Sequence, residues 1–227
     1  MISVVIPALN AEAHLPHTFD CLIQATVRGL VREVIVADGG SSDGTLILAD
    51  GVGARLVSAP KGRGQQLAAG AGAASFDWLL FLHADTALEP GWEAEVESFI
   101  ERASVARPRA AAFRFALDDF GFGARLLEFL VLLRCLVFGL PYGDQGLLMP
   151  RRLYQQIGGY RPLPLMEDVD IIRRIGRLRL TRLRARAVTS AERFRHEGYL
   201  RRSLRNLSIL LLYALRVPAP VLAKLYG

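Results

Sequence analysis

Asp85 stands at the end of a short apolar segment, in the sequence Phe81-Leu82-His83-Ala84-Asp85-Thr86. A carboxylate in this place suits a hard divalent cation that bridges phosphate oxygens. Mg²⁺ takes one or two protein carboxylates and completes its shell with substrate and water. The structural alternative is an aspartate that caps the turn before Thr86.

Asp38 ends a second apolar segment and is followed by Gly39, Gly40 and Ser41. An aspartate there can accept hydrogen bonds from a base N–H or a ribose hydroxyl, while the small residues let a ligand approach the backbone. A turn-forming aspartate is the alternative.

The basic loop Lys61-Gly62-Arg63-Gly64 precedes a helical pattern. Its cationic side chains and free backbone N–H groups can hold phosphates. The loop lacks the spacing of a P-loop, and the chain has no GxGxxG motif. Neither a nucleotide hydrolase nor a nicotinamide enzyme is therefore indicated.

Glu167 and Asp168 are adjacent acids that open a helix in the basic part of the chain. Stabilisation of the helix N-terminus, worth about 0.3–1 kcal/mol, explains such a pair without any chemistry. Pro162 and Pro164 hold the acids on a constrained loop, which favours a role in a site.

The first hundred residues alternate short apolar segments with helical patterns, which is typical of βαβ units and a mainly parallel sheet. In such sheets ligands bind beyond the carboxyl ends of the strands. Polar clusters at 7–12, 38–43 and 83–85 all follow strands, so we expect them to share one site. Strands are predicted at 2–6, 33–37, 54–58 and 78–82, and helices at 12–29, 45–51 and 65–74.

Beyond residue 105 the pattern changes, with neither a repeat nor a flexible linker. We predict strands at 110–116, after 146 and at 181–188, and helices at 122–138, 151–158, 166–177 and along the C-terminus. The expected organisation is one α/β domain over residues 1–198 with a helical appendage over 199–227.

Charge is distributed unevenly along the chain. Residues 1–150 carry 11 Lys and Arg against 17 Asp and Glu, whereas residues 151–227 carry 17 against 5. The net charge of +6 therefore hides a polarised chain. Such polarity indicates a partner with phosphates: nucleic acid, an anionic membrane surface or a phosphorylated small molecule.

Composition narrows the class of protein. With 52% apolar residues the chain is neither disordered nor collagen-like. Cys21 and Cys135 lie far apart among apolar neighbours, which favours two reduced core thiols in a cytosolic protein over a disulfide or a zinc site. The apolar run at 2–6 ends at Pro7 and is too short for a signal peptide, and the run at 126–140 is too short to span a membrane.

Taken in order, these motifs resemble those of the family 2 glycosyltransferases, inverting enzymes of the GT-A fold. The segment 4–12 is similar to the opening strand and nucleotide loop, 36–45 to the second loop, and 82–85 to the metal motif. The segment 146–160, followed by Glu167 and Asp168, resembles the acceptor side and the catalytic-base motif. Phe-Arg-Phe near residue 114 and Pro-Tyr-Gly-Asp-Gln near residue 143 are most similar to a small bacterial subgroup.

The resemblance implies a Rossmann-like, nucleotide-diphospho-sugar transferase fold, with a mixed, mainly parallel sheet flanked by helices. It implies transfer of a sugar from a nucleoside diphosphate, expected to be UDP, to a hydroxyl acceptor, with Mg²⁺ or Mn²⁺ as the cofactor. Asp168 would be the base, Glu167 would orient it or contact the acceptor, and Asp85 would hold the metal. The implied donor-binding residues are Pro7, Asn10, Glu12, Asp38, Lys61, Arg63 and Ala84, with Arg193 and Arg195 closing over the diphosphate.

One position departs from the family pattern. The usual metal motif has aspartates at both ends, and His83 takes the first place here. Because Mg²⁺ prefers oxygen, we expect His83 to pack or hydrogen-bond near the nucleotide while Asp85 keeps the metal.

Two other function classes stay open. A sugar-nucleotide-binding protein without transferase activity would keep Asp38 and Asp85 but would not need Asp168. The hypothesis of a nucleic-acid-binding protein rests on charge alone. Polynucleotide binding with a steep salt dependence would support it. We expect no nucleic-acid partner.

The C-terminal helix carries leucines at helical spacing, with Arg201, Arg202 and Arg205 on its flanks. This pattern predicts docking at the inner face of the cell membrane and a lipid-linked or otherwise membrane-proximal acceptor. Ile209 and Leu210 widen the apolar surface almost all round, which also fits a helix buried in the domain or in a dimer interface.

Overall fold

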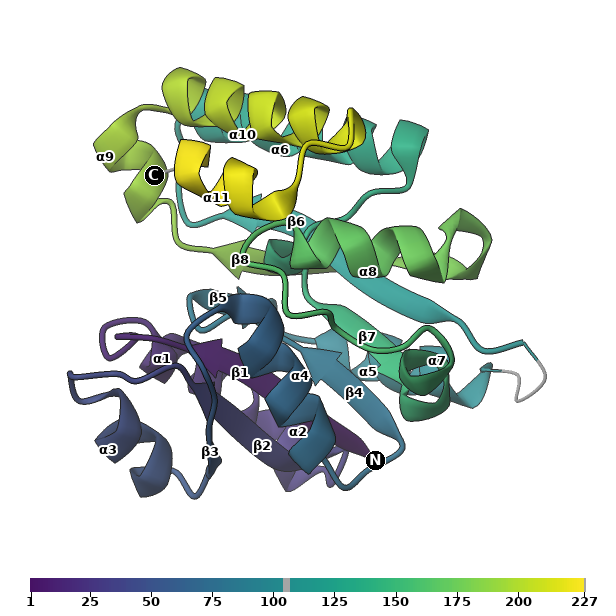
Figure 1. Cartoon of the computed structure of the whole chain (residues 1–227). Coiled ribbons are helices and arrows are strands. Elements are labelled where there is room, and N and C mark those ends of the chain that lie inside the picture. The colour runs from purple at the N-terminus through teal and green to yellow at the C-terminus, as the bar shows by residue number, and fades with distance from the viewer. Residues whose placement is uncertain (104–106, 227) are drawn as a thin grey trace.

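The computed structural model describes residues 1–103 and 107–226, which form an eight-stranded sheet with helices on both faces (Figure 1). The strands are β1 Ile2–Ala8, β2 Val31–Asp38, β3 Arg55–Ser58, β4 Trp78–Phe81, β5 Thr86–Leu88, β6 Ala110–Leu117, β7 Leu147–Pro150 and β8 Leu180–Thr189. The helices are α1 Leu15–Asp20, α2 Ile23–Val27, α3 Thr45–Gly51, α4 Arg63–Ala73, α5 Trp92–Glu101, α6 Phe122–Phe138, α7 Arg151–Gln156, α8 Glu167–Ile175, α9 Glu192–Glu197, α10 Tyr199–Ala214 and α11 Ala219–Tyr226.

The strand order is β3-β2-β1-β4-β7-β6-β8-β5. Strands β1 to β4 pair in parallel, β7 runs antiparallel to both β4 and β6, and β6 pairs in parallel with β8. The prediction of a mixed, mainly parallel sheet is therefore confirmed. In the register, Ala8 lies opposite Asp38 and Val5 opposite Phe81, so the loops that follow β1, β2 and β4 leave the same edge of the sheet.

The core lies on both faces of the sheet because its central strands are apolar on both sides. Side chains such as Val4 and Leu80 pack toward α1, α2 and α5 on one face. Val5 and Leu79 pack toward α4, α7 and α8 on the other. A third cluster of buried side chains, around Val131 and Cys135, lies beneath α6. Buried central strands of this kind hold the loops at their ends in fixed positions.

Two predicted elements differ from the structure, and one region carried no prediction. The helix expected at 12–29 is two short helices, α1 and α2, and the region without a prediction contains β5 and α5. The long helix expected over 199–227 is interrupted once, where Pro218, which has no N–H to donate, precedes α11. At its start, Gly198 adopts a positive φ of 84° and separates α10 from α9.

The C-terminal segment packs on the rest of the fold. Helix α10 lies beside α6 in Figure 1, and a Cβ placed on Gly123 would meet the Tyr199 ring at 3.1 Å. The domain limits of 1–198 and 199–227 stay a prediction. In the part of the chain that the structure describes, no helix has the length and apolarity that crossing a membrane requires.

Candidate active site

Two adjoining cavities open at the edge of the sheet where the loops after β1 and β4 converge. We call the one lined by the loop after β1 the β1 cavity, and the one lined by the start of α8 the α8 cavity. The two cavities have six lining residues in common: Arg63, His83, Asp85, Leu165, Glu167 and Arg193.

The β1 cavity contains most of the predicted donor-binding residues. Its further lining includes Pro7, Asn10, Lys61 and Ala84. Asn10 has a positive φ of 50°, a conformation that Asn tolerates better than most residues. Its side-chain oxygen accepts a hydrogen bond from the Ser42 N–H at 2.9 Å, which ties the loop after β1 to the loop after β2.

Three predicted donor-binding residues line neither cavity. The Asp38 carboxylate accepts hydrogen bonds from the Gly40 N–H at 2.8 Å and the Ser41 hydroxyl at 2.5 Å. Glu12 accepts one from the Gly44 N–H at 2.8 Å. Arg195 forms an ion pair with Asp118, in which Nη1 lies 3.6 Å from Oδ1. These side chains bond to the protein's own loops, and donor contact by them stays a prediction.

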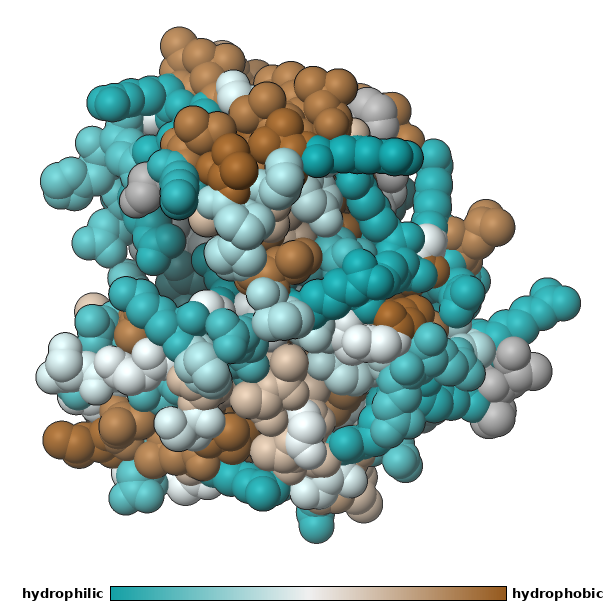
Figure 2. Space-filling view, viewed as in Figure 1, coloured by the Kyte–Doolittle hydropathy of each residue, from teal (hydrophilic) through white to brown (hydrophobic). Residues whose placement is uncertain are grey.

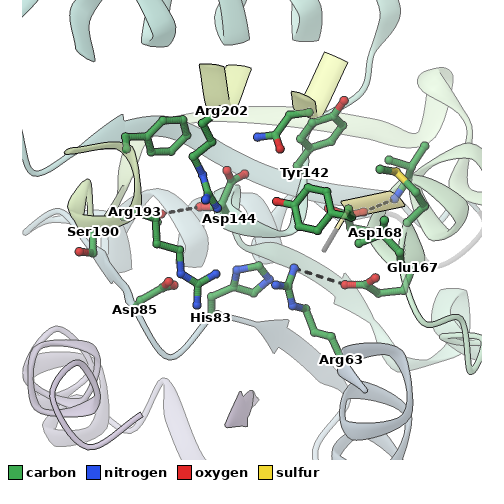
Figure 3. A pocket seen from close by; sticks show the side chains of 17 residues that line it. Arg63, His83, Asp85, Tyr142, Asp144, Glu167, Asp168, Ser190, Arg193 and Arg202 are labelled. Carbon is green, nitrogen blue, oxygen red and sulfur yellow. Dashed lines mark hydrogen bonds and ion pairs between the residues drawn. The ribbon is translucent and has the colours of Figure 1, made fainter. Parts of the chain in front are cut away.

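Asp85 and His83 lie between the two cavities, at the end of β4. Figure 3 shows His83 beside Arg63 and Asp85 beside Arg193, with Tyr142 and Asp144 facing them from the opposite side. The Thr86 hydroxyl lies 3.4 Å from Asp85 Oδ1, a long and weak hydrogen bond, so capping leaves most of this carboxylate free. Burial and the Arg63 charge lower the pKa of His83 to about 4. His83 is therefore neutral at pH 7, as its expected packing role requires.

Asp168 is held by backbone donors on two sides. Its Oδ2 accepts a hydrogen bond from the Gly143 N–H at 3.0 Å, and its Oδ1 accepts one from the Val169 N–H at 2.7 Å. Met166, which caps α8, has a positive φ of 66° and turns the chain into the helix. The carboxylate is thereby fixed in the wall of the α8 cavity.

Glu167 points to the other side and pairs with Arg63. Its Oε1 lies 3.4 Å from Arg63 Nη1, and the residue is 3% exposed. Burial and the neighbouring Asp168 raise the pKa of Glu167, while Arg63 opposes the shift. Burial lowers the pKa of Arg63, but the carboxylates of Glu167, Asp168 and Asp85 outweigh it, so this pKa is raised and Arg63 stays charged. Arg63 thus keeps its positive charge between the cavities.

The donor set near Asp85 fits a hard divalent cation. Asp85 offers carboxylate oxygens to both cavities, and the buried Asp144 Oδ1 in the α8 cavity has no hydrogen-bond partner. Among residues 1–103 and 107–226, no cluster of three or more His, Cys, Asp and Glu side chains is arranged around a single ion position. A cation at Asp85 would therefore take most of its ligands from the substrate and water, as Mg²⁺ commonly does.

Several lining residues of the α8 cavity carried no prediction of a role in this site. Arg202, expected on a flank of the C-terminal helix that faces a membrane, is 9% exposed and lines the cavity instead. Tyr142 and Asp144 come from the loop before β7, Ser190 follows β8, and Arg202, Asn206 and Tyr226 come from α10 and α11. The Tyr142-Gly143-Asp144 sequence could have signalled the first two. Arg202 and Asn206 are four residues apart on one face of a helix, a spacing that surface residues share.

The family model for glycosyl transferase family 2 matches residues 3–116, half of the chain. The chain belongs to this family. The match includes the loop after β1, the basic loop Lys61-Gly62-Arg63-Gly64 and the Asp85 position, and it ends within β6.

Relatives of this chain include two groups of mycobacterial proteins. Glucosyl-3-phosphoglycerate synthase of Mycobacterium tuberculosis is 42% identical over 93 residues, which are 37% of this chain and 28% of that protein. A PGL/p-HBAD biosynthesis glycosyltransferase of Mycobacterium bovis is 37% identical over 108 residues, 44% of this chain and 41% of that protein. The matches therefore span less than half the length of these relatives.

Solved structures extend the likeness beyond the matched segment. Glucosyl-3-phosphoglycerate synthase of M. tuberculosis, in complex with Mn²⁺, UDP and glucosyl-3-phosphoglycerate, has a TM-score of 0.58 at 25% identity and covers 84% of this chain and 70% of that chain. TarS of S. aureus, in complex with UDP-GlcNAc, has a TM-score of 0.63 at 15% identity and covers 83% and 58%. The TarS likeness shows the fold alone.

Proposed function

We propose that this protein transfers a sugar from a uridine diphosphate sugar to a hydroxyl acceptor, with inversion at the anomeric carbon. The observation that carries the proposal is the boundary between the two cavities, where Asp85, Arg63 and Arg193 line both. Inversion requires the attacking hydroxyl and the leaving diphosphate on opposite sides of the anomeric carbon. Two cavities that meet at a charged boundary provide those two sides.

The nucleotide would occupy the β1 cavity. Pro7, Asn10, Lys61 and Ala84 line it, and the solved glucosyl-3-phosphoglycerate synthase binds UDP in a related fold. Asp38 and Glu12 support this cavity indirectly, because their carboxylates hold the loops through backbone N–H groups. Lys61 and Arg63 offer positive charge to the diphosphate.

Asp168 would act as the base. The acceptor oxygen attacks the anomeric carbon, its proton passes to the Asp168 carboxylate, and the bond to the diphosphate breaks with the electron pair on the leaving oxygen. Hydrogen bonds from Gly143 and Val169 fix the direction of the carboxylate, so it needs no rearrangement to receive the proton. Such a base contributes about 10²–10⁴-fold to the rate.

Charge on the departing diphosphate would be stabilised at the boundary. Arg63 is positioned there by Glu167, and Arg193 approaches from the first turn of α9. Asp85 would hold the divalent cation, Mg²⁺ or Mn²⁺, which supplies further positive charge to the phosphate oxygens when bound. Arg195 is paired with Asp118, so Arg193 is the better placed of the two.

The proposal extends to the location and the acceptor. We place the reaction in the cytoplasm, at the inner face of the cell membrane, with an acceptor that is lipid-linked or otherwise held near that surface. The support is the basic composition of residues 151–227 and the exposed leucines of α10.

Calorimetry with UDP-sugars tests the donor half of the proposal. Binding should strengthen with Mn²⁺ and weaken with EDTA, and Asp85→Ala should abolish the metal effect. Asp50→Ala, which removes an exposed carboxylate on α3, is the matched control and should bind like the wild type. Metal-independent binding that Asp85→Ala leaves unchanged would contradict the metal assignment, and binding without any turnover on hydroxyl acceptors would favour the non-catalytic alternative.

A further inference from the structure

Helices α6, α10 and α11 present a continuous apolar surface to solvent. Figure 2 shows hydrophobic side chains gathered at the top of the molecule, over the helices that Figure 1 labels α6 and α10. Phe122 is 83% exposed and Leu200 is 74% exposed. We call this surface the apolar face, and its exposed members are Phe120, Phe122, Leu126, Phe129, Leu130, Leu133, Leu136 and Val137 around α6, Leu200, Leu204, Leu207, Leu211 and Leu215 around α10, and Val221 and Leu225 on α11.

The spacing of these residues shows that the exposure is organised. On α10 they recur at intervals of three and four residues, which places them on one side of the helix. The opposite side of α10 contains the buried Arg202 and Ile209. On α6, likewise, Ala124, Val131 and Cys135 are buried while the exposed residues lie between them. Helix α6 therefore keeps one apolar side in the core and a second apolar side outside it, whereas α10 turns a mixed side with Arg202 and Ile209 inward and an apolar side outward.

Charge around the apolar face is mainly basic. Residues 199–227 contain five basic residues, Arg201, Arg202, Arg205, Arg216 and Lys224, and no Asp or Glu. Arg202 and Arg205 pair with Glu197, whereas Arg201, Arg216 and Lys224 are exposed. Glu128, the one acid in the sequence of α6, is turned inward, where its carboxylate accepts a hydrogen bond from the Leu117 N–H and pairs with Arg125. Asp119, at the start of α6, is held by the Tyr199 hydroxyl at 2.6 Å. An anionic surface complements this arrangement.

A second copy of the chain fits the apolar face less well. In a two-fold symmetric dimer the same patch faces itself, so the exposed Arg201, Arg216 and Lys224 of both copies would be brought together. A membrane surface with anionic lipids buries the same apolar side chains and attracts those charges instead.

The apolar face also lies on the wall of the α8 cavity. Arg202 and Asn206 line that cavity from the inner side of α10, and Leu204 and Leu207 on the same turns face solvent. A surface that receives the apolar face therefore lies one helix diameter, about 10–12 Å, from the wall of the α8 cavity that α10 forms.

We propose that the apolar face docks on an anionic membrane and presents the α8 cavity to acceptors held at its surface. This inference rests on the proposed function for the acceptor, but the docking itself needs no catalysis. The three helices lie in the interfacial layer with their leucines and phenylalanines among the lipid chains, and the exposed Arg201, Arg216 and Lys224 contact the headgroups.

Vesicle flotation with the full chain tests the docking. Wild-type protein should float with vesicles of phosphatidylcholine and phosphatidylglycerol, and much less with phosphatidylcholine alone. Because each basic residue near an anionic surface is worth about 1 kcal/mol, Arg201→Glu with Lys224→Glu should lower the partition coefficient by about tenfold or more. Phe129→Glu with Leu207→Glu should have at least that effect, since it places charges within the apolar face.

Matched controls come from exposed apolar residues elsewhere. Ile47 on α3 is 79% exposed and Val27 on α2 is 78% exposed, so Ile47→Glu with Val27→Glu should leave flotation unchanged. UDP-sugar binding, measured by calorimetry on all variants, should equal that of the wild type. If the wild type floats with anionic vesicles as expected but neither it nor any variant binds a UDP-sugar, the proposed function is defeated and the docking is not.

Two results would overturn the docking proposal. One is wild-type protein that remains in the soluble fraction with anionic vesicles at low salt. The other is a dimer in analytical ultracentrifugation that Phe129→Glu with Leu207→Glu converts to a monomer, because the apolar face would then be covered by a second copy.

Discussion

The loops after β1 and β2 differ from the segments around α8 in what their polar side chains bond. Asn10 and Asp38 accept hydrogen bonds from backbone N–H groups of the 40–42 turn, and Asp43 does so from Glu12 and Thr45. These two loops are similar to family motifs, yet much of their polar chemistry is satisfied within the protein.

The polar groups at the α8 cavity are less completely satisfied. Asp144 Oδ1 and Asn206 Oδ1 are buried without a hydrogen-bond partner, and both residues line this cavity. Buried polar atoms in folded proteins nearly always have partners, so unpartnered atoms in a cavity wall are the ones that a substrate can satisfy. We therefore expect the first region to set the shape of the site and the second region to supply the groups that react or recognise.

Asp168→Asn is the variant that tests the reactive side of this comparison most strongly. Transfer should fall by about a hundredfold or more, because the amide cannot accept the acceptor proton. One of the two backbone N–H donors, Gly143 or Val169, would lose its acceptor oxygen, so thermal unfolding must be measured as well. Steady-state turnover near that of the wild type would place the base elsewhere.

Gly143→Ala tests whether the site depends on close packing between β4 and the loop before β7. A Cβ at this position would lie 2.6 Å from His83 Nε2, so the ring or the loop must move. Since the same loop orients Asp168, we expect about a tenfold to hundredfold loss of kcat, with smaller changes in donor affinity. Gly72→Ala, on an open side of α4, is the control and should keep full activity.

Asp144→Asn examines a carboxyl group that the fold keeps in an unfavourable environment. Burial, with further contributions from Asp168 and Asp85 against the opposing Arg134, raises the pKa of Asp144 to about 6. A raised pKa means that the folded state holds the proton of Asp144 more tightly than the unfolded state does. The contribution of this proton to the free energy of unfolding is therefore complete below about pH 4 and is lost as the pH rises through about 6.

The Asn variant should remove this pH dependence. Urea unfolding in EDTA should show the variant more stable than the wild type at pH 7, by up to about 3 kcal/mol, and nearly equal to it at pH 4. An unchanged slope of stability against pH between those values would show that another group titrates there.

Asp38→Ala tests the architectural side of the comparison. Removal of the carboxylate leaves the Gly40 and Ser41 N–H groups without their acceptor, which should lower the free energy of unfolding by about 1–3 kcal/mol. If the side chain serves only the turn, the folded variant binds UDP-sugar with an affinity within a few-fold of the wild type. A large loss of affinity in calorimetry with little change in stability would instead confirm direct donor contact.

Sequence patterns predicted much of the architecture. The helix at 122–138, the strand at 78–82 and the placement of polar clusters at strand ends follow from local periodicity and turn residues, and all three agree with the structure within a residue or two. The motif around Asp85 and the pair Glu167 and Asp168 could be assigned because the residues of each motif are adjacent in sequence. The convergence of the loops after β1 and β4 follows from the rule that parallel strands end at one edge of the sheet. Glu167 and Asp168 follow no parallel strand, so only the tertiary structure brings them to Asp85.

The sequence by itself therefore determined the family, the α/β sheet and the positions of the metal and base candidates. Only the tertiary structure decided that Asp38 and Glu12 bond to neighbouring loops, because their partners depend on how those loops fold together. It also decided that Arg202, Asn206 and Tyr226 line the cavity at the end of β4, although they follow β4 by more than a hundred residues in the chain. A helical pattern with apolar residues on nearly every side does not tell which side the core will cover, since that depends on the packing of α10 against α6.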